Sequence, residues 1–202
     1  LAVRGWAVDL IERREGLARE TSGNPAGVLQ PVPSADGNRL SRLTLAGFHY
    51  ALRRLQEFSA DPQLIWQQCG VLRLARSERQ AERQRHIVDS GLLPPEVLRW
   101  VEVEEASLLA GWRVPAPGWW FPQGGWVHPP SLCVAALRAS GLSVRLHTQR
   151  EVADLLHTDK GWRAVDASGN VIAEAPVAIL ANGHLARRFA VSSALPLRPV
   201  RC

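Results

Sequence analysis

Apolar residues at helical spacing mark the longest element that the sequence predicts. Between residues 40 and 58 they recur every three or four positions and so share one face of a helix: Leu45, Phe48, Leu52 and Leu55. Shorter helices are predicted over residues 77–91, 104–110 and 130–140, where a Ser-Glu-Arg-Gln capping pattern, closing glycines and a starting proline mark the ends. Residues 22–35 are rich in Gly, Pro, Ser and Asn and are predicted to form a loop.

Strand-like runs occur in both halves of the chain. Residues 6–12 favour β-structure and end on an acid, so we expect a buried strand that follows a glycine-capped helix end at Gly5. Further strands are predicted over residues 68–75, 144–147 and 152–156 and in a hairpin formed by 162–165 and 171–173. The uninterrupted apolar run 177–181 is expected to be a central parallel strand covered on both faces. Helices mixed with buried and hairpin strands predict an α/β protein with a second, more antiparallel part.

The composition is that of a folded, mildly basic protein. With 202 residues the chain can form one large domain or two small ones, and a charged fraction of 21% excludes a disordered chain. A net charge of +5, carried mainly by arginine, permits a polyanionic partner such as RNA without being diagnostic of one. No apolar run approaches the roughly 20 residues of a membrane-spanning helix, and no signal peptide is recognisable. We therefore expect a soluble cytoplasmic protein without a membrane partner.

The cysteines and the chain ends add two expectations. Cys69, Cys133 and Cys202 are far apart and lack paired spacing, so we expect neither a metal site nor a disulfide framework, as suits a reducing cytoplasm. The chain begins at Leu1 without methionine and ends just after an apolar stretch at 195–197. Both ends are therefore expected to be cuts through a longer protein.

The segment 118–130 holds three of the eight tryptophans beside paired glycines. Because glycine lacks a Cβ, an aromatic wall next to Gly124 and Gly125 is a place where a flat ligand can approach the backbone. The alternative is a packed aromatic hairpin, since buried tryptophan is common in protein cores. On these residues alone the two interpretations are equally supported.

Two strand ends carry residues typical of dinucleotide binding. Glu12 follows a strand, and a carboxylate at this position accepts hydrogen bonds from an adenosine ribose in βαβ units. The matching glycine fingerprint is expected about 20 residues upstream, outside this chain. Asn182 and Gly183 follow the apolar run 177–181, at a strand end of the kind where a nucleotide approaches the backbone. A surface glutamate and a plain tight turn are the alternatives for these two features.

Together these features resemble the D-amino-acid oxidase-like superfamily of FAD-dependent enzymes, which includes glycine and sarcosine oxidases. Residues 22–29, 40–46 and 118–127 are also similar to the oxidoreductase half of the bifunctional enzymes of tRNA 5-methylaminomethyl-2-thiouridine biosynthesis. Residues 195–201 resemble that family too, except that Cys202 stands where a glycine is expected. The resemblance implies an α/β fold with a FAD-binding Rossmann-like parallel sheet and an antiparallel substrate-side domain, whose N-terminal strand and glycine loop are missing from this chain.

The resemblance further implies how the chain divides and where it contacts FAD. It assigns residues 1–60 and 129–202 to a partial FAD-binding domain and residues 61–128 to a substrate domain. The implied cofactor-binding residues are Glu12, Ser22, Gly23, Asn24, Val152, Asn182 and Gly183. The residues implied to line the flavin and substrate pocket are Gly124, Gly125 and Trp126.

The reaction implied by the resemblance is the oxidation of a secondary amine on tRNA. The carboxymethyl group of a wobble 5-carboxymethylaminomethyl-2-thiouridine is removed, through an imine that hydrolyses, to leave the 5-aminomethyl form. The implied partners are tRNA and a fused methyltransferase domain that uses S-adenosylmethionine and lies outside this chain. The alternatives are a small-molecule amine oxidase of the glycine or sarcosine type and an inactive fragment that lacks tightly bound flavin.

The charged residues of the motifs leave one role open. Arginine is the natural partner of a substrate carboxylate because its guanidinium forms a bidentate fork, and Arg42, Arg113 and Arg198 are equal candidates. His128 and His184 lie in motif segments and are expected to be structural rather than catalytic. A flavin enzyme needs positioning and a dry pocket more than an array of acids and bases, which agrees with the lack of a Ser-His-Asp order.

Overall fold

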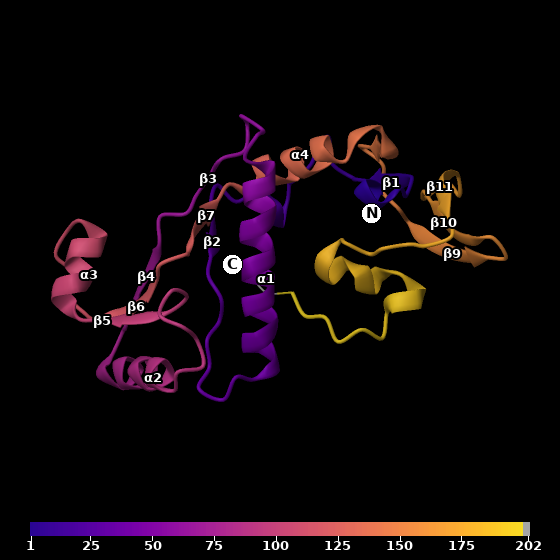
Figure 1. Cartoon of the computed structure of the whole chain (residues 1–202). Helices are drawn as coiled ribbons and strands as arrows, with labels where there is room; N and C mark the ends of the chain where they lie inside the picture. Colours follow the sequence, from indigo (N-terminus) through magenta and orange to yellow (C-terminus); the bar gives the residue numbers. More distant parts are fainter. Residues whose placement is uncertain (200–202) are drawn as a thin grey trace. The chain divides into compact units, whose positions relative to one another are not determined.

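The computed structural model describes residues 1–199, which fold into two compact units (Figure 1). One unit comprises residues 1–19 together with the chain from residue 140 onward, and the other comprises residues 20–139. The first unit contains both parallel and antiparallel strand pairs, and the second contains antiparallel pairs only among the described residues. Together with the helices, this mixture confirms the predicted α/β class. Compactness does not test which segments bind FAD and which bind substrate, so the functional division of the sequence stays a prediction.

The first unit contains one parallel pair of strands. β1 (Val8–Ile11) pairs with β8 (Val144–His147), and Val8 lies opposite Val144. An antiparallel sheet of order β11-β10-β9 consists of β9 (Asp154–Thr158), β10 (Gly161–Val165) and β11 (Val171–Ala175). The helical turns are η1 (Ala2–Arg4), η3 (Gly141–Ser143), η4 (Gly183–Arg188) and η5 (Ala190–Ser192). Gly5, with a φ of 85°, closes η1 as the glycine-cap pattern predicts.

Two strand predictions in this unit need correction. Residues 177–181 form no strand, and Val177 and Ile179 are exposed at 58% and 65%. A central strand needs a neighbour on each side, but the parallel sheet of residues 1–199 consists of β1 and β8 alone, and the apolar run pairs with neither. β1 itself is half-buried rather than buried, with Leu10 exposed at 37%.

The second unit contains the four predicted helices. They are α1 (Arg39–Phe58), α2 (Glu78–Asp89), α3 (Val103–Ala110) and α4 (Pro129–Ala139). Their ends follow the sequence signals. The Ser77 hydroxyl accepts a hydrogen bond from the Gln80 N–H at the start of α2, and Gly111, with a φ of 75°, ends α3. The apolar face of α1 is buried as predicted, through Phe48, Leu52 and Leu55.

The strands of the second unit form two antiparallel sheets. One has the order β2-β7-β3 and consists of β2 (Gly27–Leu29), β7 (Gly125–Val127) and β3 (Trp66–Gln67). The other has the order β4-β6-β5 and consists of β4 (Val71–Leu74), β6 (Gly118–Phe121) and β5 (Arg99–Val101). The predicted loop over residues 22–35 thus contains a short turn, η2 (Thr21–Gly23), at its start and the strand β2.

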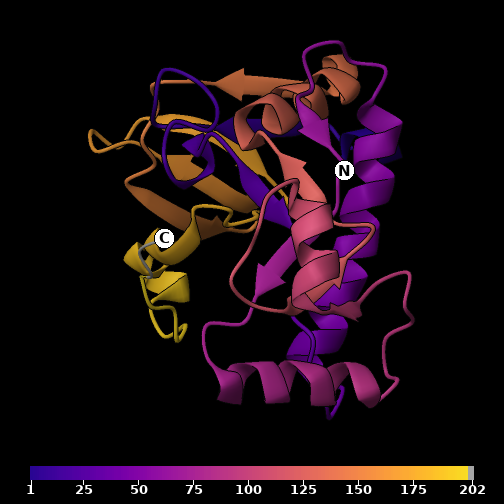
Figure 2. The same cartoon turned by 90° about the vertical axis from the view of Figure 1, so that its left-hand side faces the viewer.

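Aromatic side chains of β6 pack on both faces of the β4-β6-β5 sheet. The core on the α2 side is formed by Ile87, Leu98, Trp119 and Phe121. The core on the α3 side is formed by Val101, Ala106 and Val114, with Trp120 packed against it. Figures 1 and 2 show α2 and α3 on different sides of these strands. The packed-core interpretation of the Trp-rich segment is therefore confirmed for β6.

A tight turn carries the Trp-rich segment from one sheet into the other, and in it the Gly124 N–H donates to the Phe121 carbonyl at 2.9 Å. Val71 lies opposite Phe121 and Gln67 lies opposite Trp126, so the three residues 68–70 face the four residues 122–125. The segment 122–125 is thus one residue longer than the segment it faces. The Gly70 N–H donates to the Gly124 carbonyl at 2.9 Å, which holds the two segments together where the regular pairing stops.

Candidate cofactor and substrate site

Glu12 lies at the carboxyl end of the parallel strand β1. Its N–H donates to the His147 carbonyl at 2.8 Å, which extends the pairing of β1 with β8 by one residue. Its side chain is half-buried, and Oε1 accepts a hydrogen bond from the Arg14 N–H at 2.7 Å. The carboxylate is therefore held at the strand end by a local turn. Ligands of open α/β sheets bind at this end of the strands.

The chain before Val152 runs beside Glu12. The Arg150 N–H donates to the Glu12 carbonyl at 3.1 Å, and the Gln149 N–H donates to the Arg14 carbonyl at 2.8 Å. Val152 follows two residues later and is half-buried. The sequence predicted a strand that begins at Val152, but β9 begins at Asp154, so Val152 lies just before the strand. The first unit thus brings the segment of Val152 and Glu12 together.

Asn182 and Gly183 lie at the start of η4 and are both exposed. Gly183 has a φ of 60°, which glycine adopts without strain, and a Cβ added there would meet no atom within 4 Å. The backbone conformation therefore accounts for this glycine, as in the tight-turn interpretation. No hydrogen bond within residues 1–199 joins this pair to Glu12.

Ser22, Gly23 and Asn24 belong to the second unit and are exposed. The Gly23 N–H donates to the Glu20 carbonyl at 2.8 Å and closes the turn η2, which contacts α4. The polar turn stands just before β2, the strand that pairs with the end of the Trp-rich segment.

The paired glycines of the Trp-rich segment are explained by the protein's own backbone. A Cβ on Gly125 would lie 2.0 Å from the Gln67 carbonyl oxygen, and one on Gly124 would lie 3.1 Å from the Leu29 carbonyl oxygen. Both glycines are buried. The close approach of β7 to its two neighbouring strands thus requires residues without a side chain, whatever ligand is present.

Trp126 lies on a different kind of surface from the tryptophans of β6. It is partly exposed and lies directly opposite Val28, which is 64% exposed. Residues directly opposite in neighbouring strands share one face of a sheet. The two side chains therefore form an open apolar surface on the β2-β7-β3 sheet.

Gln30 is a residue that the sequence reasoning missed. It directly follows β2, and its Oε1 is buried without a hydrogen-bond partner among the described residues. A buried polar atom without a partner costs about 1–3 kcal/mol, so such an atom points to a group that completes it. The available signal was a lone amide between Leu29 and Pro31 in an otherwise apolar stretch.

The three candidate arginines lie on separate segments. Arg42 is on the first turns of α1, Arg113 follows α3, and Arg198 follows η5. All three are exposed, and none forms an ion pair with another described residue. His128 has a capping role: its Nδ1 accepts from the Ser131 N–H at the start of α4.

A charged cluster on the parallel strands was also missed. Asp9 Oδ1 lies 2.7 Å from His147 Nε2, and Asp9 Oδ2 accepts from Arg145 Nη2 at 3.0 Å. The hydrogen bond with His147, followed by that with Arg145, lowers the pKa of Asp9 below its usual value. The parallel register places Asp9 opposite Arg145, and this register is what the sequence alone could not supply.

Residues 1–199 contain neither a cluster of metal-ligating side chains nor a membrane-spanning helix. No group of three or more His, Cys, Asp and Glu side chains is arranged to hold a metal ion. No helix in this part of the chain is long and apolar enough to cross a membrane.

Comparison with known proteins identifies the family. The profile of the FAD dependent oxidoreductase family matches residues 1–202, the whole chain. The chain belongs to this family. FAD is the cofactor of the family, and the resemblance that the Trp-rich segment and the strand ends suggested is thereby confirmed.

The relatives of this FAD dependent oxidoreductase include tRNA-modifying proteins. It is similar to the tRNA 5-methylaminomethyl-2-thiouridine biosynthesis bifunctional proteins MnmC of Aromatoleum aromaticum, at 48% identity over 202 residues, and Pseudomonas fluorescens, at 40% over 201 residues. Both alignments cover 100% of this chain, but only 32% and 29% of the relatives. The chain thus spans about a third of the length of these relatives.

Solved structures show the same fold. Glycine oxidase from Geobacillus kaustophilus superposes with a TM-score of 0.69 at 24% identity, over 93% of this chain and 52% of that one. L-proline dehydrogenase from P. horikoshii superposes with a TM-score of 0.72 at 16% identity, over 98% and 52%. At these identities the likeness concerns the fold of this chain and not its substrate.

Proposed function

We propose that this chain is part of an FAD-dependent oxidoreductase that acts on the wobble uridine of tRNA. In this proposal it removes the carboxymethyl group from 5-carboxymethylaminomethyl-2-thiouridine and leaves the 5-aminomethyl form. The observation that carries the proposal is the 48% identity to a tRNA 5-methylaminomethyl-2-thiouridine biosynthesis bifunctional protein over all 202 residues. The proposed setting is the cytoplasm, beside a fused methyltransferase domain that uses S-adenosylmethionine.

Several residues of the chain suit a bound FAD. Glu12 offers a carboxylate at the carboxyl end of a parallel strand, the place at which such folds bind the ribose of a dinucleotide. Gln30 offers a buried amide oxygen that has no hydrogen-bond partner among the described residues. We assign the ribose to Glu12 and the pyrophosphate and flavin to the exposed turn of Ser22, Gly23 and Asn24. The remaining proposed contacts are Val152, Asn182 and Gly183.

The protein's own part in the proposed reaction is positioning and exclusion of water. When bound, FAD supplies the two-electron oxidation of the amine carbon–nitrogen bond. The apolar surface of Val28 and Trp126 faces the reacting carbon and is closed to water when the substrate covers it, and Gly124 and Gly125 let the strands beneath it come close together. Water then adds to the imine, the carbon–nitrogen bond breaks, and the carboxymethyl carbons leave as the aldehyde acid while the amine stays on the uridine.

The reaction is tested with the protein in its full natural length. Purified protein is incubated with tRNA that carries 5-carboxymethylaminomethyl-2-thiouridine, and the nucleosides are analysed by mass spectrometry. The expected result is loss of the carboxymethyl mass and appearance of the 5-aminomethyl nucleoside. Turnover of free glycine or sarcosine without any change in the tRNA contradicts the proposal and supports a small-molecule amine oxidase.

The cofactor assignment is tested separately with a matched pair of variants. Glu12→Gln removes the negative charge at the strand end, and FAD binding to the apoprotein is expected to weaken about 10- to 100-fold, since a hydrogen bond to a charged group is lost. Glu15→Gln makes the same change three residues later, where the side chain is 71% exposed and pairs with Arg19. This control is expected to bind FAD like the wild type in a titration followed by flavin fluorescence. Equal affinities for the two variants exclude Glu12 from the FAD site.

A further inference from the structure

A cavity of about 300 Å³ lies beside the first turns of α1 in the second unit. It is lined by Asp36, Ser41, Arg42, Leu45, Leu92 and Leu93. Three of these residues belong to the Leu-Ser-Arg-Leu-Thr-Leu-Ala stretch over 40–46, one of the sequence features that point to the tRNA-modifying relatives. In the proposed flavin chemistry the one candidate role for this stretch is that of Arg42 as a partner of the substrate carboxylate.

Ser41 is a largely buried residue whose hydroxyl forms no hydrogen bond with a described residue. Ser41 is only 6% exposed and lines the cavity. The helix end is already capped by Asn38, whose Oδ1 accepts from the Ser41 N–H at 3.0 Å. Within residues 1–199 no hydrogen bond is made by the Ser41 hydroxyl itself. A hydroxyl at the wall of a cavity can donate to and accept from a ligand there.

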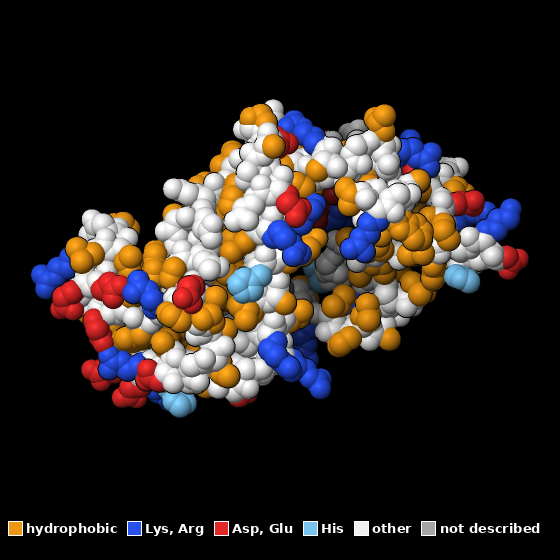
Figure 3. Space-filling view, viewed as in Figure 1, with side chains coloured by type: hydrophobic (Ala, Val, Ile, Leu, Met, Phe, Trp, Pro, Cys, Tyr) orange, Lys and Arg blue, Asp and Glu red, His pale blue; other side chains and the backbone are white. Residues whose placement is uncertain are grey.

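The cavity is lined by one acidic and one basic side chain, Asp36 and Arg42, which form no ion pair with each other. Arg42 is exposed and forms no ion pair with a described residue. Asp36 is tied to the cap instead, because its Oδ1 accepts from both the N–H and the Nδ2 of Asn38. Figure 3 shows basic side chains gathered where α1 begins. The guanidinium of Arg42 is thus available to an anionic group.

The rest of the cavity wall is aliphatic. Leu45 comes from α1, and Leu92 and Leu93 come from the loop after α2. Leu92 is 52% exposed, and the backbone of Gly37 packs closely enough that a Cβ there would lie 3.5 Å from Leu92 Cδ1. Such a wall suits the flat, apolar face of a nucleobase.

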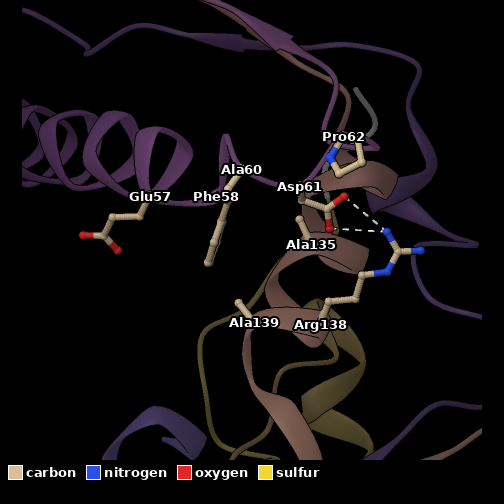
Figure 4. A pocket seen from close by; sticks show the side chains of 8 residues that line it. All are labelled: Glu57, Phe58, Ala60, Asp61, Pro62, Ala135, Arg138 and Ala139. Carbon is tan, nitrogen blue, oxygen red and sulfur yellow. Dashed lines mark hydrogen bonds and ion pairs between the residues drawn. The ribbon is translucent and has the colours of Figure 1, made fainter.

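A second cavity also contains an arginine, but there the arginine is paired within the protein. It has a volume of about 370 Å³ and lies between the C-terminal ends of α1 and α4 (Figure 4). Its arginine, Arg138, is already held by Asp61 at 3.2 Å and by Gln63 at 2.6 Å. The charged group there serves the protein's own structure, whereas among the described residues the Arg42 guanidinium forms no ion pair and the Ser41 hydroxyl forms no hydrogen bond.

We propose that the cavity at Ser41 receives one unstacked nucleotide of the tRNA substrate. The base lies against the leucines, the Ser41 hydroxyl hydrogen-bonds to the edge of the base, and Arg42 pairs with a phosphate. Proteins that read RNA by sequence take single-stranded bases out of the stack in this way. The inference rests on the proposed function, which supplies the tRNA.

The test compares tRNA binding by three variants of the full-length, FAD-loaded protein. Arg42→Gln is expected to weaken binding about five- to tenfold at low salt and to lower the slope of log Kd against log salt by about one, since one phosphate contact is lost. Ser41→Ala is expected to weaken binding about three- to tenfold with an unchanged salt slope, since a base contact is lost. Arg53→Gln is the matched control, because Arg53 is an exposed arginine on the same helix that lies over Tyr50 and outside the cavity.

The outcomes separate this inference from the proposed function. In one outcome the wild type binds and modifies tRNA, Arg42→Gln has the tRNA affinity and salt slope of Arg53→Gln, and Ser41→Ala has the affinity of the wild type. This result excludes the nucleotide pocket and leaves the proposed function standing. If the wild type neither binds nor modifies tRNA, both fall. Photocrosslinking of thiouridine-substituted tRNA provides a second readout, in which crosslinks to the peptide of Leu92 and Leu93 support the pocket. Saturation of the cavity by a free mononucleotide without competition against tRNA assigns it to a free ligand and overturns the proposal.

Discussion

β6 and β7 come from one short segment of sequence but lie in different surroundings. In β6, Trp119 is 6% exposed, packs in the core under α2 and donates from Nε1 to the Gln84 carbonyl at 2.9 Å. In β7, Trp126 is partly exposed beside Val28 on an open sheet face. A turn over residues 122–124 separates the two strands.

The difference teaches that one aromatic and glycine-rich motif can serve two purposes. Its glycines are required by strands that approach closely, as the 2.0 Å between a Cβ on Gly125 and the Gln67 oxygen shows. Its aromatic residues divide between the core and an open face. The core interpretation is confirmed for Trp119, and the pocket interpretation stays a prediction for Trp126.

The largest expected effect separates the two tryptophans. Trp119→Ala is expected to lower the free energy of unfolding by about 3–5 kcal/mol, because it leaves a cavity in the core and removes a hydrogen bond. Trp126→Ala is expected to cost about 1 kcal/mol or less but to lower kcat/KM on tRNA about tenfold. Urea unfolding followed by circular dichroism and steady-state kinetics measure the two effects. Equal losses of stability would show that the two strands have the same role.

The next effect concerns the glycine at the start of β7. Gly125→Ala is expected to destabilise the protein by about 3 kcal/mol, since the new methyl group overlaps the Gln67 carbonyl and the strand must move. Gly47→Ala is the control, because a Cβ at this helical position meets no atom within 4 Å, and it is expected to stabilise by about 1 kcal/mol. Both are measured by urea unfolding. A neutral Gly125→Ala contradicts the close approach of the strands.

A smaller effect concerns the core beneath β6. Gln84 in α2 is 2% exposed, and both polar atoms of its side chain are buried without a partner in the described structure. Gln84→Met keeps the volume and removes the unpaired amide, so it is expected to stabilise the protein by about 1 kcal/mol. Thermal unfolding tests this expectation. A loss of stability instead indicates a water molecule or another partner that satisfies the amide.

The smallest expected effect concerns the first unit, where Asp9 on β1 pairs with His147 and Arg145 on β8. Because the folded structure lowers the pKa of Asp9, its stabilising contribution is present above the unfolded pKa and is lost as the pH falls through the folded value. Asp9→Asn is therefore expected to destabilise the protein near neutral pH and to flatten the loss of stability in acid. Unfolding measured from neutral to acid pH checks this, with Asp159→Asn, at an exposed position between β9 and β10, as the control. An unchanged acid profile for Asp9→Asn contradicts the role of the cluster.

Local signals were enough for the helices. The apolar spacing that buries Phe48, Leu52 and Leu55, the Ser77 cap and the glycine at 111 act over a few residues, so the sequence alone places α1, α2 and α3. The strand predicted over residues 177–181 is wrong, because a strand needs neighbouring strands to pair with and an apolar composition does not provide them. The same limit hid the Asp9 cluster, which depends on the register of β1 against β8.

The sequence by itself determined the family, the helices and the residues that motifs single out, such as Glu12 and Trp126, since these depend on local order along the chain. The tertiary structure decided which tryptophan is core and which is open, and why Gly125 must be glycine. It also decided that Ser41 and Arg42 border one cavity with leucines from a loop some 50 residues away. These features depend on which strands and loops meet, and a bulge or a shift of register changes them without altering any local pattern.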